Sequence, residues 1–378
     1  MLSIVIEYEV FVLFSLMASK NVIPLQHQNK SDMKKNLVKL EAHDAFEYTD
    51  IVYISDKLKV FYPNTYARLT KLFENEIIEW EEVKGTKDIW IRDYMPIQKS
   101  NDFFISYNYD PDYLQGYRQK YLTDSHDIIK IIPQIKEVIN SNIKLDGGNV
   151  IITPYHWILT DKVFEENGME KYDTSFISLL REIAGSDIIL LPWHKEEDDK
   201  PWSDVYGHAD GLVQWTGENN ILMANYRDFY PEEANEIIRR LNKAGYKVTE
   251  MLFDVTNPNY ELNWAYINYL KVDKKIIVPT FGIDEDKQAL FYISKANPHC
   301  TIIPFRMRDI ARNGGAIHCI TWNIKFRINK NEQIVLPAPY ELYKGCSISG
   351  SSSQTTIRNI WSSTSYFPLK FGGKEKSL

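Results

Sequence analysis

Five stretches of the chain carry apolar residues at helical spacing, and short apolar segments typical of strands alternate with them. The helical stretches are Pro63–Glu74, Ser125–Asn140, Asp173–Ala184, Pro231–Ala244 and Glu285–Ala296. The strand segments that follow are Ile77–Val83, Val150–Thr153, Ile188–Leu191, Val248–Phe253 and Thr301–Pro304. Helices that alternate with strands predict an α/β fold with parallel pairing inside each unit.

Local signals support several of these boundaries. Pro63 and Pro231 stand where the first helical turn accepts proline, and Asp173 is a plausible helix N-cap. Gly245 follows the fourth helical stretch, where a C-terminal glycine is favoured. Pro133 lies inside the second stretch and predicts a kink or an early end there.

The helical stretches begin roughly 50–60 residues apart, and a repeat of this size predicts a closed, pseudo-symmetric ring in a single domain. An open doubly wound sheet is the alternative, although the chain contains neither G-x-G-x-x-G nor G-x-x-x-x-G-K. We expect the domain to cover residues 50–330. An N-terminal segment at 1–49 precedes it, and a tail at 331–378, rich in Ser and Gly in its first half, follows it.

Composition narrows the classes of function. The chain has 378 residues and a net charge of −7, which disfavours nucleic acid as a partner and suits a small cationic ligand. Three cysteines without a C-x-x-C pair predict neither a disulfide framework nor structural zinc. The apolar run Val10–Ala18 follows Glu7 and Glu9, and it is too short for a membrane span. We therefore expect a cytoplasmic protein without membrane contact, while the signal-like run leaves export open.

Polar residues that come at the same stage of different repeats are the candidates for chemistry. Cys319 follows Gly314-Gly315, a pair that allows a ligand to approach the backbone closely, although a lone Cys is more often a small buried apolar residue. His208 is the candidate acid and base, and Asp210 would share its strand face. Asp93 stands among Trp90, Tyr94 and Met95, which favours a partly buried acid. A surface His–Asp neighbour pair and an Arg92–Asp93 ion pair are the plainer interpretations.

Four segments in this order, WIRDYMP, LDGGNV, GHADGLVQ and GGAIHCITW, resemble the signature blocks of the agmatine deiminase and bacterial-type peptidyl-arginine deiminase family. The resemblance covers about residues 50–326. It implies the guanidine-modifying superfamily's fold, a five-bladed α/β propeller (pentein-like), and a site without metal or cofactor. The family's functional residues map to Asp93, His208, Asp210 and the nucleophile Cys319, and Asn268 matches an Asn of the peptidyl-arginine branch.

The chemistry of a guanidinium group agrees with this set. A planar cation with paired N–H groups is matched by two carboxylates, here Asp93 and Asp210, which would hold its central carbon over Cys319. Thiolate attack, protonation of the departing amine by His208 and hydrolysis of an amidino-thioether would release ammonia and a ureido product. We expect activation of Cys319 to depend partly on the substrate cation. Trp90 and Gly315 are further candidates for substrate contact, although core packing is the commoner role for a Trp.

The resemblance leaves the substrate open. The Trp-Glu-Pro opening of agmatine deiminases is missing, the second block has Asp146 where Glu is usual, and Arg118 alone could read a substrate carboxylate. Agmatine, converted to N-carbamoylputrescine in putrescine and polyamine biosynthesis, is the preferred substrate. Arginine or a C-terminal peptidyl-arginine is the first alternative, and a silent propeller that binds guanidines or polyamines is the second. The expected partner is this small guanidino molecule, and a monomer and a homodimer are both compatible with the sequence.

Overall fold

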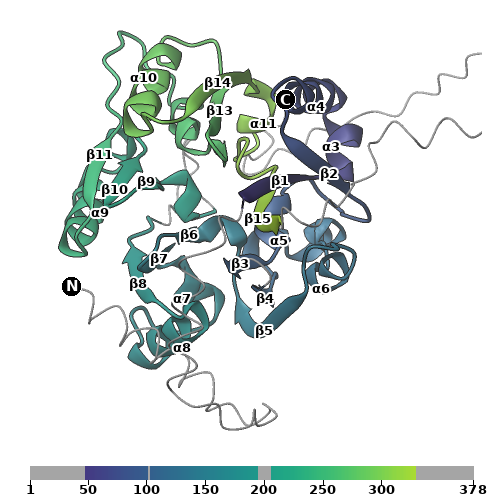
Figure 1. Ribbon diagram of the computed structural model, residues 1–378. Coiled ribbons are helices and arrows are strands. Elements are labelled where there is room, and N and C mark those ends of the chain that lie inside the picture. Colours follow the sequence, from purple (N-terminus) through teal and green to yellow (C-terminus); the bar gives the residue numbers. More distant parts are fainter. Residues whose placement is uncertain (1–46, 101–102, 195–205, 329–378) are drawn as a thin grey trace, which may run out of the picture.

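The structure is a computed structural model that describes residues 47–100, 103–194 and 206–328 (Figure 1). The run Val10–Ala18, the tail at 331–378 and the third cysteine, Cys346, lie outside these ranges. Within the described ranges, none of the helices combines the length and the apolar character that crossing a membrane requires.

Five three-stranded sheets with one common strand arrangement make up the fold. The middle strands are β1 (Glu47–Ser55), β4 (Phe103–Asn108), β7 (His156–Thr160), β10 (Asn220–Met223) and β13 (Lys275–Thr280). Each pairs antiparallel with one of the strands that we call inner: β15 (Trp322–Ile328), β3 (Ile97–Ser100), β6 (Ile151–Ile152), β9 (Val213–Gly217) and β12 (Leu270–Val272). Each pairs parallel with an outer strand: β2 (Glu79–Val83), β5 (Glu137–Lys144), β8 (Asp187–Leu191), β11 (Lys247–Glu250) and β14 (Thr301–Arg306).

Helical segments connect each middle strand to its parallel partner. They are α3 (Asp56–Phe61), α4 (Pro63–Asn75), η1 (Asp112–Leu114), η2 (Gly116–Tyr121), α6 (Ser125–Ile129), α7 (Lys162–Glu166), α8 (Thr174–Ala184), η5 (Tyr226–Asp228), α9 (Pro231–Lys243) and α10 (Asp286–Ala296). In Figure 1 the helices α3, α4, α6, α8, α9 and α10 lie outside, and β3, β6, β9 and β15 lie toward the centre. The predicted α/β class is confirmed, and so is parallel pairing in four of the five units. The predicted strand Val150–Thr153 instead forms the inner strand β6, which pairs antiparallel with β7. The inner antiparallel strand of each sheet is an addition to the prediction.

Four of the five predicted helices occur where the pattern placed them. Pro63 and Pro231 stand at the first helical positions of α4 and α9. The carboxylate of Asp173 caps α8 by accepting a hydrogen bond from the Phe176 amide. Gly245 follows α9 with a φ of 93°, a conformation that glycine adopts without strain. Turn and cap chemistry therefore predicted the ends of these helices well.

The second predicted helix, Ser125–Asn140, is wrong over most of its length. Helix α6 ends at Ile129, and residues Glu137–Lys144 form strand β5. Pro133 interrupts the helical hydrogen bonds, and β5 gains parallel pairing with β4 instead. The β-branched residues Val138, Ile139 and Ile143 favour that strand, and tertiary pairing outweighs the helical spacing of the isoleucines before them.

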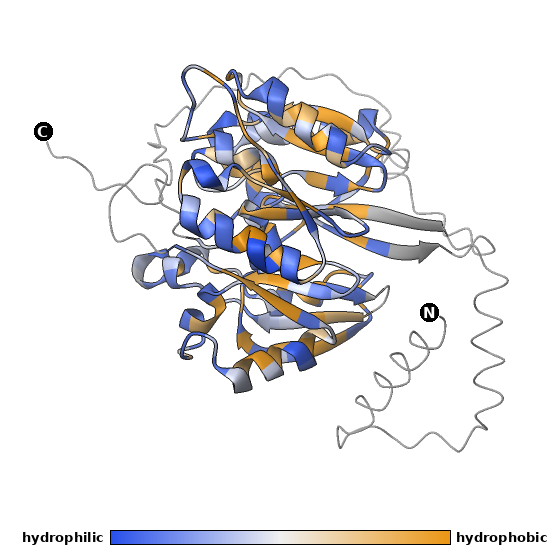
Figure 2. Ribbon diagram, turned by 90° about the vertical axis from the view of Figure 1, so that its left-hand side faces the viewer, coloured by the Kyte–Doolittle hydropathy of each residue, from blue (hydrophilic) through white to orange (hydrophobic). Residues whose placement is uncertain are grey.

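The core consists of apolar clusters between the sheets and the helices. Figure 2 shows mainly hydrophobic strands, while the helices carry hydrophilic residues as well. Helix α9 buries Ala234, Ile237 and Leu241, which lie three and four residues apart on one face.

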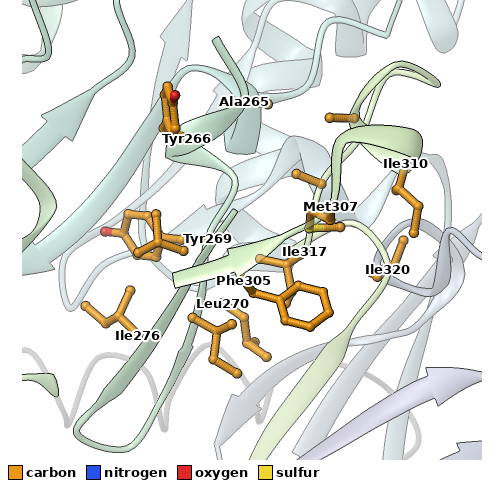
Figure 3. Close-up of a cluster of buried hydrophobic side chains, with 14 of the residues drawn as sticks. Ala265, Tyr266, Tyr269, Leu270, Ile276, Phe305, Met307, Ile310, Ile317 and Ile320 are labelled. Carbon is orange, nitrogen blue, oxygen red and sulfur yellow. The ribbon is translucent and has the colours of Figure 1, made fainter. Parts of the chain in front are cut away.

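One cluster anchors the segment around the candidate nucleophile. Ile317 and Ile320 flank Cys319 and are fully buried in the cluster that also contains Phe305, Met307 and Ile310 (Figure 3). Burying each of these isoleucines contributes roughly 1.5–3 kcal/mol. The backbone on both sides of Cys319 is thereby fixed to the core.

Candidate active site

The candidate residues sit on short turns that immediately precede the inner strands. These turns are α5 (Ile91–Tyr94), η3 (Gly147–Asn149), η4 (Ala209–Gly211), η6 (Asn263–Ile267) and the turn at 317–320 that follows α11 (Arg308–Ala311). The turns contact one another in chain order, α5 with η3, η3 with η4, and η4 with η6. The Arg92 amide donates to the Cys319 carbonyl, and the His318 amide donates to the Asn268 carbonyl, which completes a closed cycle.

The turn at His208 corrects the expectation that His208 and Asp210 share a strand face. His208 caps a 3₁₀ turn that contains Asp210. The backbone hydrogen bonds Gly211 N–H to His208 O and Leu212 N–H to Ala209 O close this turn. Both side chains still enter the site, because the turn sends the imidazole toward Asp93 and the carboxylate toward Cys319.

Cys319 is buried, and Asp210 is its side-chain neighbour. Its thiol donates to Asp210 Oδ2 over 3.6 Å. Its backbone amide donates to Asn268 Oδ1 over 3.2 Å, and the Ala316 amide donates to the same oxygen over 3.0 Å. Burial, together with the carboxylates of Asp210 and Asp93, raises the pKa of the Cys319 thiol well above its usual value. In the empty site the thiol therefore keeps its proton at neutral pH.

His208 is held between two carboxylates. Its Nε2 lies 2.8 Å from Asp146 Oδ2, and its Nδ1 lies 3.6 Å from Asp93 Oδ1. Burial acts to lower the pKa of this imidazole, but the two carboxylates outweigh burial and raise the pKa to about 10. Burial raises the pKa of Asp93, against the opposing effect of His208. The resting site thus holds an imidazolium between two acids.

Gly148 lets three functional groups approach one point. Its amide donates to Asp93 Oδ1 over 3.1 Å. A Cβ at this position would stand 2.6 Å from Asp93 Oδ1, 2.7 Å from His208 Nδ1 and 3.4 Å from Asp210 Oδ1. The conformation of Gly148 does not require glycine, so the closeness of these side chains is what excludes a larger residue.

The structure adds supporting residues that the sequence did not single out. Asp146, noted from the sequence only as a departure from the family's usual Glu, accepts the hydrogen bond from His208, and the buried Lys162 lies 3.7 Å from the same carboxylate oxygen. His318 Nδ1 lies 2.7 Å from Asp210 Oδ2, a hydrogen bond that counteracts burial and lowers the pKa of Asp210. Adjacency to Cys319 was the available signal for His318, whereas nothing in the pattern marked Lys162 as buried.

Arg92 supports the backbone around Cys319. Its Nε donates to the His318 carbonyl over 3.4 Å, and one terminal nitrogen donates to Asn323 Oδ1 over 3.0 Å. These contacts, rather than an ion pair with Asp93, engage the guanidinium among the described residues. Arg92 and His318 also line a cavity of about 310 Å³ that extends between the beginnings of β3, β6, β9 and β15.

Trp90 and Gly315, the further candidates for substrate contact, pack against each other. A Cβ at Gly315 would collide with the Trp90 ring and stand 3.0 Å from the Cβ of Cys319. Tyr113 and Tyr206 each lie 6.2 Å from the His208 ring, measured between ring centroids. Aromatic rings therefore lie beside both Cys319 and His208.

Metal coordination finds no support in the described part of the chain. No group of three or more His, Cys, Asp or Glu side chains in those ranges is arranged so that it could hold a metal ion. The expectation of a site without metal or cofactor stays a prediction.

Solved structures share this fold. Agmatine deiminase of C. jejuni superposes with a TM-score of 0.56 at 18% identity, covering 73% of this chain and 93% of that chain. Agmatine deiminase of Enterococcus faecalis gives a TM-score of 0.52 at 16% identity and covers 73% and 93% of the two chains. The described sheets therefore have the fold of agmatine deiminases.

Sequence comparison then identifies the family. The family model of the Porphyromonas-type peptidyl-arginine deiminases matches residues 21–324, and the chain belongs to this family. A curated relative from Marinomonas sp. (strain MWYL1), named "Putative agmatine deiminase", is 40% identical over 60 residues, which span 16% of each chain. A relative of the same name from Selenomonas ruminantium is 24% identical over 136 residues, or 36% of each chain. The aligned segments thus cover well under half of these relatives, and the family predicted from the four sequence blocks is confirmed.

Proposed function

We propose that this protein hydrolyses the guanidinium group of a small substrate, with agmatine preferred, and releases ammonia and N-carbamoylputrescine. One observation carries the proposal: the thiol of Cys319 lies 3.6 Å from the buried carboxylate of Asp210. Asp93 and His208 face the same point across Gly148. Buried carboxylates beside a thiol suit a cationic electrophile, because an anionic or neutral one would leave their charge uncompensated.

Asp93 and Asp210 would bind the two edges of the guanidinium plane. Each carboxylate can accept charge-assisted hydrogen bonds from a pair of N–H groups. The absence of a side chain at Gly148 lets the Asp93 and Asp210 carboxylates approach one point, so that both could reach one guanidinium group. The bound cation would offset the burial that raises the pKa of Asp93, so it would favour the ionised carboxyl group.

The substrate would also activate the nucleophile. Binding of a cation beside Cys319 opposes the effect of the two carboxylates, so the thiol loses its proton to solvent and attacks the central carbon. The imidazolium of His208 then gives its proton to the departing amine, and ammonia leaves. The product of this half-reaction is a cationic amidino-thioether on Cys319 with a neutral His208.

Water completes the cycle. Neutral His208 takes a proton from the attacking water, and a second tetrahedral adduct forms. Its collapse breaks the carbon–sulfur bond, returns the electron pair to Cys319 as thiolate and leaves the ureido product. The proton that remains on the product passes to solvent, where the released ammonia becomes ammonium. The thiolate of Cys319 recovers its proton from solvent, and His208 is again an imidazolium.

For the whole molecule we propose the five-bladed propeller that the resemblance implies. Two facts support it: the five sheets share one strand arrangement, and the turns before their inner strands contact one another in a closed cycle. In such a ring each blade contributes one turn to the site.

A substrate with a carboxylate is the second candidate. Arg118 donates to the carbonyl of Tyr113 over 3.3 Å, and the Tyr113 hydroxyl donates to Asp146 over 3.2 Å. A guanidinium this close to the site could pair with the carboxylate of arginine or of a C-terminal peptidyl-arginine. The name of the matched family points in the same direction.

Ammonia release from agmatine, arginine and a peptide ending in arginine tests the proposal. Cys319→Ala should abolish release, and Cys300→Ala is the matched control, because Cys300 is a free, partly exposed cysteine before β14. Release from agmatine alone would support the preferred substrate. Release from the peptide would support the second candidate, a substrate whose carboxylate pairs with Arg118. A protein that releases no ammonia from any of them, yet protects Cys319 from a haloacetamidine when guanidine is added, would be a silent binder and would refute the proposal.

A further inference from the structure

Lys162 is a buried lysine directly behind the candidate acid–base pair. It begins helix α7, and its side chain is 1% exposed. A buried ammonium group is unfavourable unless partners compensate its charge. Lys162 Nζ lies 2.8 Å from Glu166 Oε1, 3.3 Å from Asp112 Oδ1 and 3.7 Å from Asp146 Oδ2. Burial acts to lower the pKa of Lys162, but these carboxylates outweigh it, so the group stays charged.

A single carboxylate oxygen links Lys162 to the catalytic histidine. Asp146 Oδ2 accepts hydrogen bonds from His208 Nε2 at 2.8 Å and from the Tyr113 hydroxyl at 3.2 Å, and it also forms the ion pair with Lys162. Positive charge near this oxygen reduces the negative potential that the imidazole experiences. The more Lys162 is neutralised by other carboxylates, the more strongly Asp146 holds the imidazolium.

Glu166 is the buried carboxylate that competes with Asp146 for the ammonium group of Lys162. Its side chain is 5% exposed, whereas that of Asp112 is 50% exposed and screened by water. Burial, together with Asp146, raises the pKa of Glu166 to about 7, so Glu166 is ionised over the higher pH range in which His208 titrates.

The other groups that face His208 hold it in the protonated form. Asp93 and Asp146 are its close carboxylate neighbours, and Asp210 lies across Gly148. Tyr113 and Tyr206 contribute aromatic rings, and burial keeps the Tyr113 hydroxyl neutral by raising its pKa well above the usual value. Lys162 is the cation that opposes this set from the side of Asp146.

We propose that Lys162 is a positioning residue that sets the proton affinity of His208 through Asp146, with its charge shared between Asp146 and Glu166. The proposal rests on the proposed function, in which His208 must first give up a proton and then accept one from water. Without Lys162, the carboxylates would hold the imidazolium so strongly that its proton transfer to the departing amine, in the first half-reaction, would slow. With Lys162, His208 can alternate between its two protonation states.

Two substitutions should move the titration of His208 in opposite directions. Lys162→Met removes the opposing cation and should raise the pKa of His208 by about one unit. Glu166→Gln releases Lys162 from its second partner and should lower the pKa of His208. Asp112→Asn is the matched control, because it removes a carboxylate from the same lysine at a solvent-screened position, and its shift should be much smaller than that of Glu166→Gln.

The measurement is the imidazole NMR titration of His208 in the substrate-free protein, with rapid-quench detection of the adduct on Cys319 during turnover. Lys162→Met should form the adduct more slowly than the wild type, Glu166→Gln should not, and Lys162→Arg should restore the wild-type titration. The double variant Lys162→Met/Glu166→Gln keeps the net charge of the cluster and serves if the single Lys variant does not fold. Because the titration needs no turnover, it tests Lys162 even if none of the guanidino substrates is hydrolysed. Equal shifts of one sign in both single variants, or no shift in folded variants, would overturn the proposal.

Discussion

Replacing Gly148 by alanine should disable catalysis by displacing the groups that bind the guanidinium. The added methyl carbon would stand 2.6 Å from Asp93 Oδ1 and 2.7 Å from His208 Nδ1, while ordinary contact begins at 3.4 Å. Asp93 would therefore have to move by about 0.8 Å. A misplacement of about 1 Å in a catalytic geometry can lower the rate about 100-fold, which corresponds to about 2.7 kcal/mol of transition-state stabilisation.

The control is Gly211→Ala, on the turn that carries Asp210. A Cβ at Gly211 would meet only the Trp264 ring, at 4.0 Å. The carboxylates of Asp93 and Asp210 and the thiol of Cys319 therefore do not have to move. Ammonia release measured over a range of substrate concentrations gives kcat/KM for both variants, and thermal unfolding reports whether each is folded. A folded Gly148→Ala variant whose kcat/KM stays within about threefold of the wild type would refute this reasoning.

Two further predictions concern the nucleophile. Asn268→Ala leaves the buried amides of Ala316 and Cys319 without their acceptor, at a cost of about 1–3 kcal/mol for each amide. Urea unfolding should show this loss of stability, and ammonia release should show a lower kcat. An unchanged unfolding midpoint would contradict the prediction. Since the pKa of the Cys319 thiol is raised by burial and by Asp210 and Asp93, its alkylation by iodoacetamide in the empty enzyme should keep accelerating as the pH rises above 9. The partly exposed Cys300 is the internal reference, and a plateau for Cys319 by pH 8 would rule out this explanation.

The sequence predicted the helices with clear end signals and failed where pairing decided the structure. Pro63, Pro231 and Asp173 act through contacts within one turn, which are visible in the sequence. The fate of residues 137–144 depended on a strand more than 30 residues earlier, and the inner strand β6 is only two residues long. Periodicity carries no information about such partners.

In the site, too, the sequence identified residues by type and position but could not show which distant residues they contact. Asp93, His208, Asp210 and Cys319 were singled out by residue type and by their place in the repeats, and the structure brings all four together. The part of Asp146 depends on a histidine 62 positions later, and the pairing of His318 depends on an aspartate 108 positions earlier. Lys162 begins a short helix where an exposed lysine would be unremarkable, so its burial could be known only from the packing.

The pairing of β1 with β15 has a consequence for the order of events during synthesis. The first described strand of the chain completes its sheet only with the last, and β15 follows Cys319 directly. Contacts between such distant segments form late, after the intervening chain has become available. A nascent chain that has passed residue 210 already contains Asp93, His208 and Asp210, but Cys319 is not yet made and the first sheet lacks a strand. A chain that ends before residue 319 would therefore contain both carboxylates and His208 without the thiol.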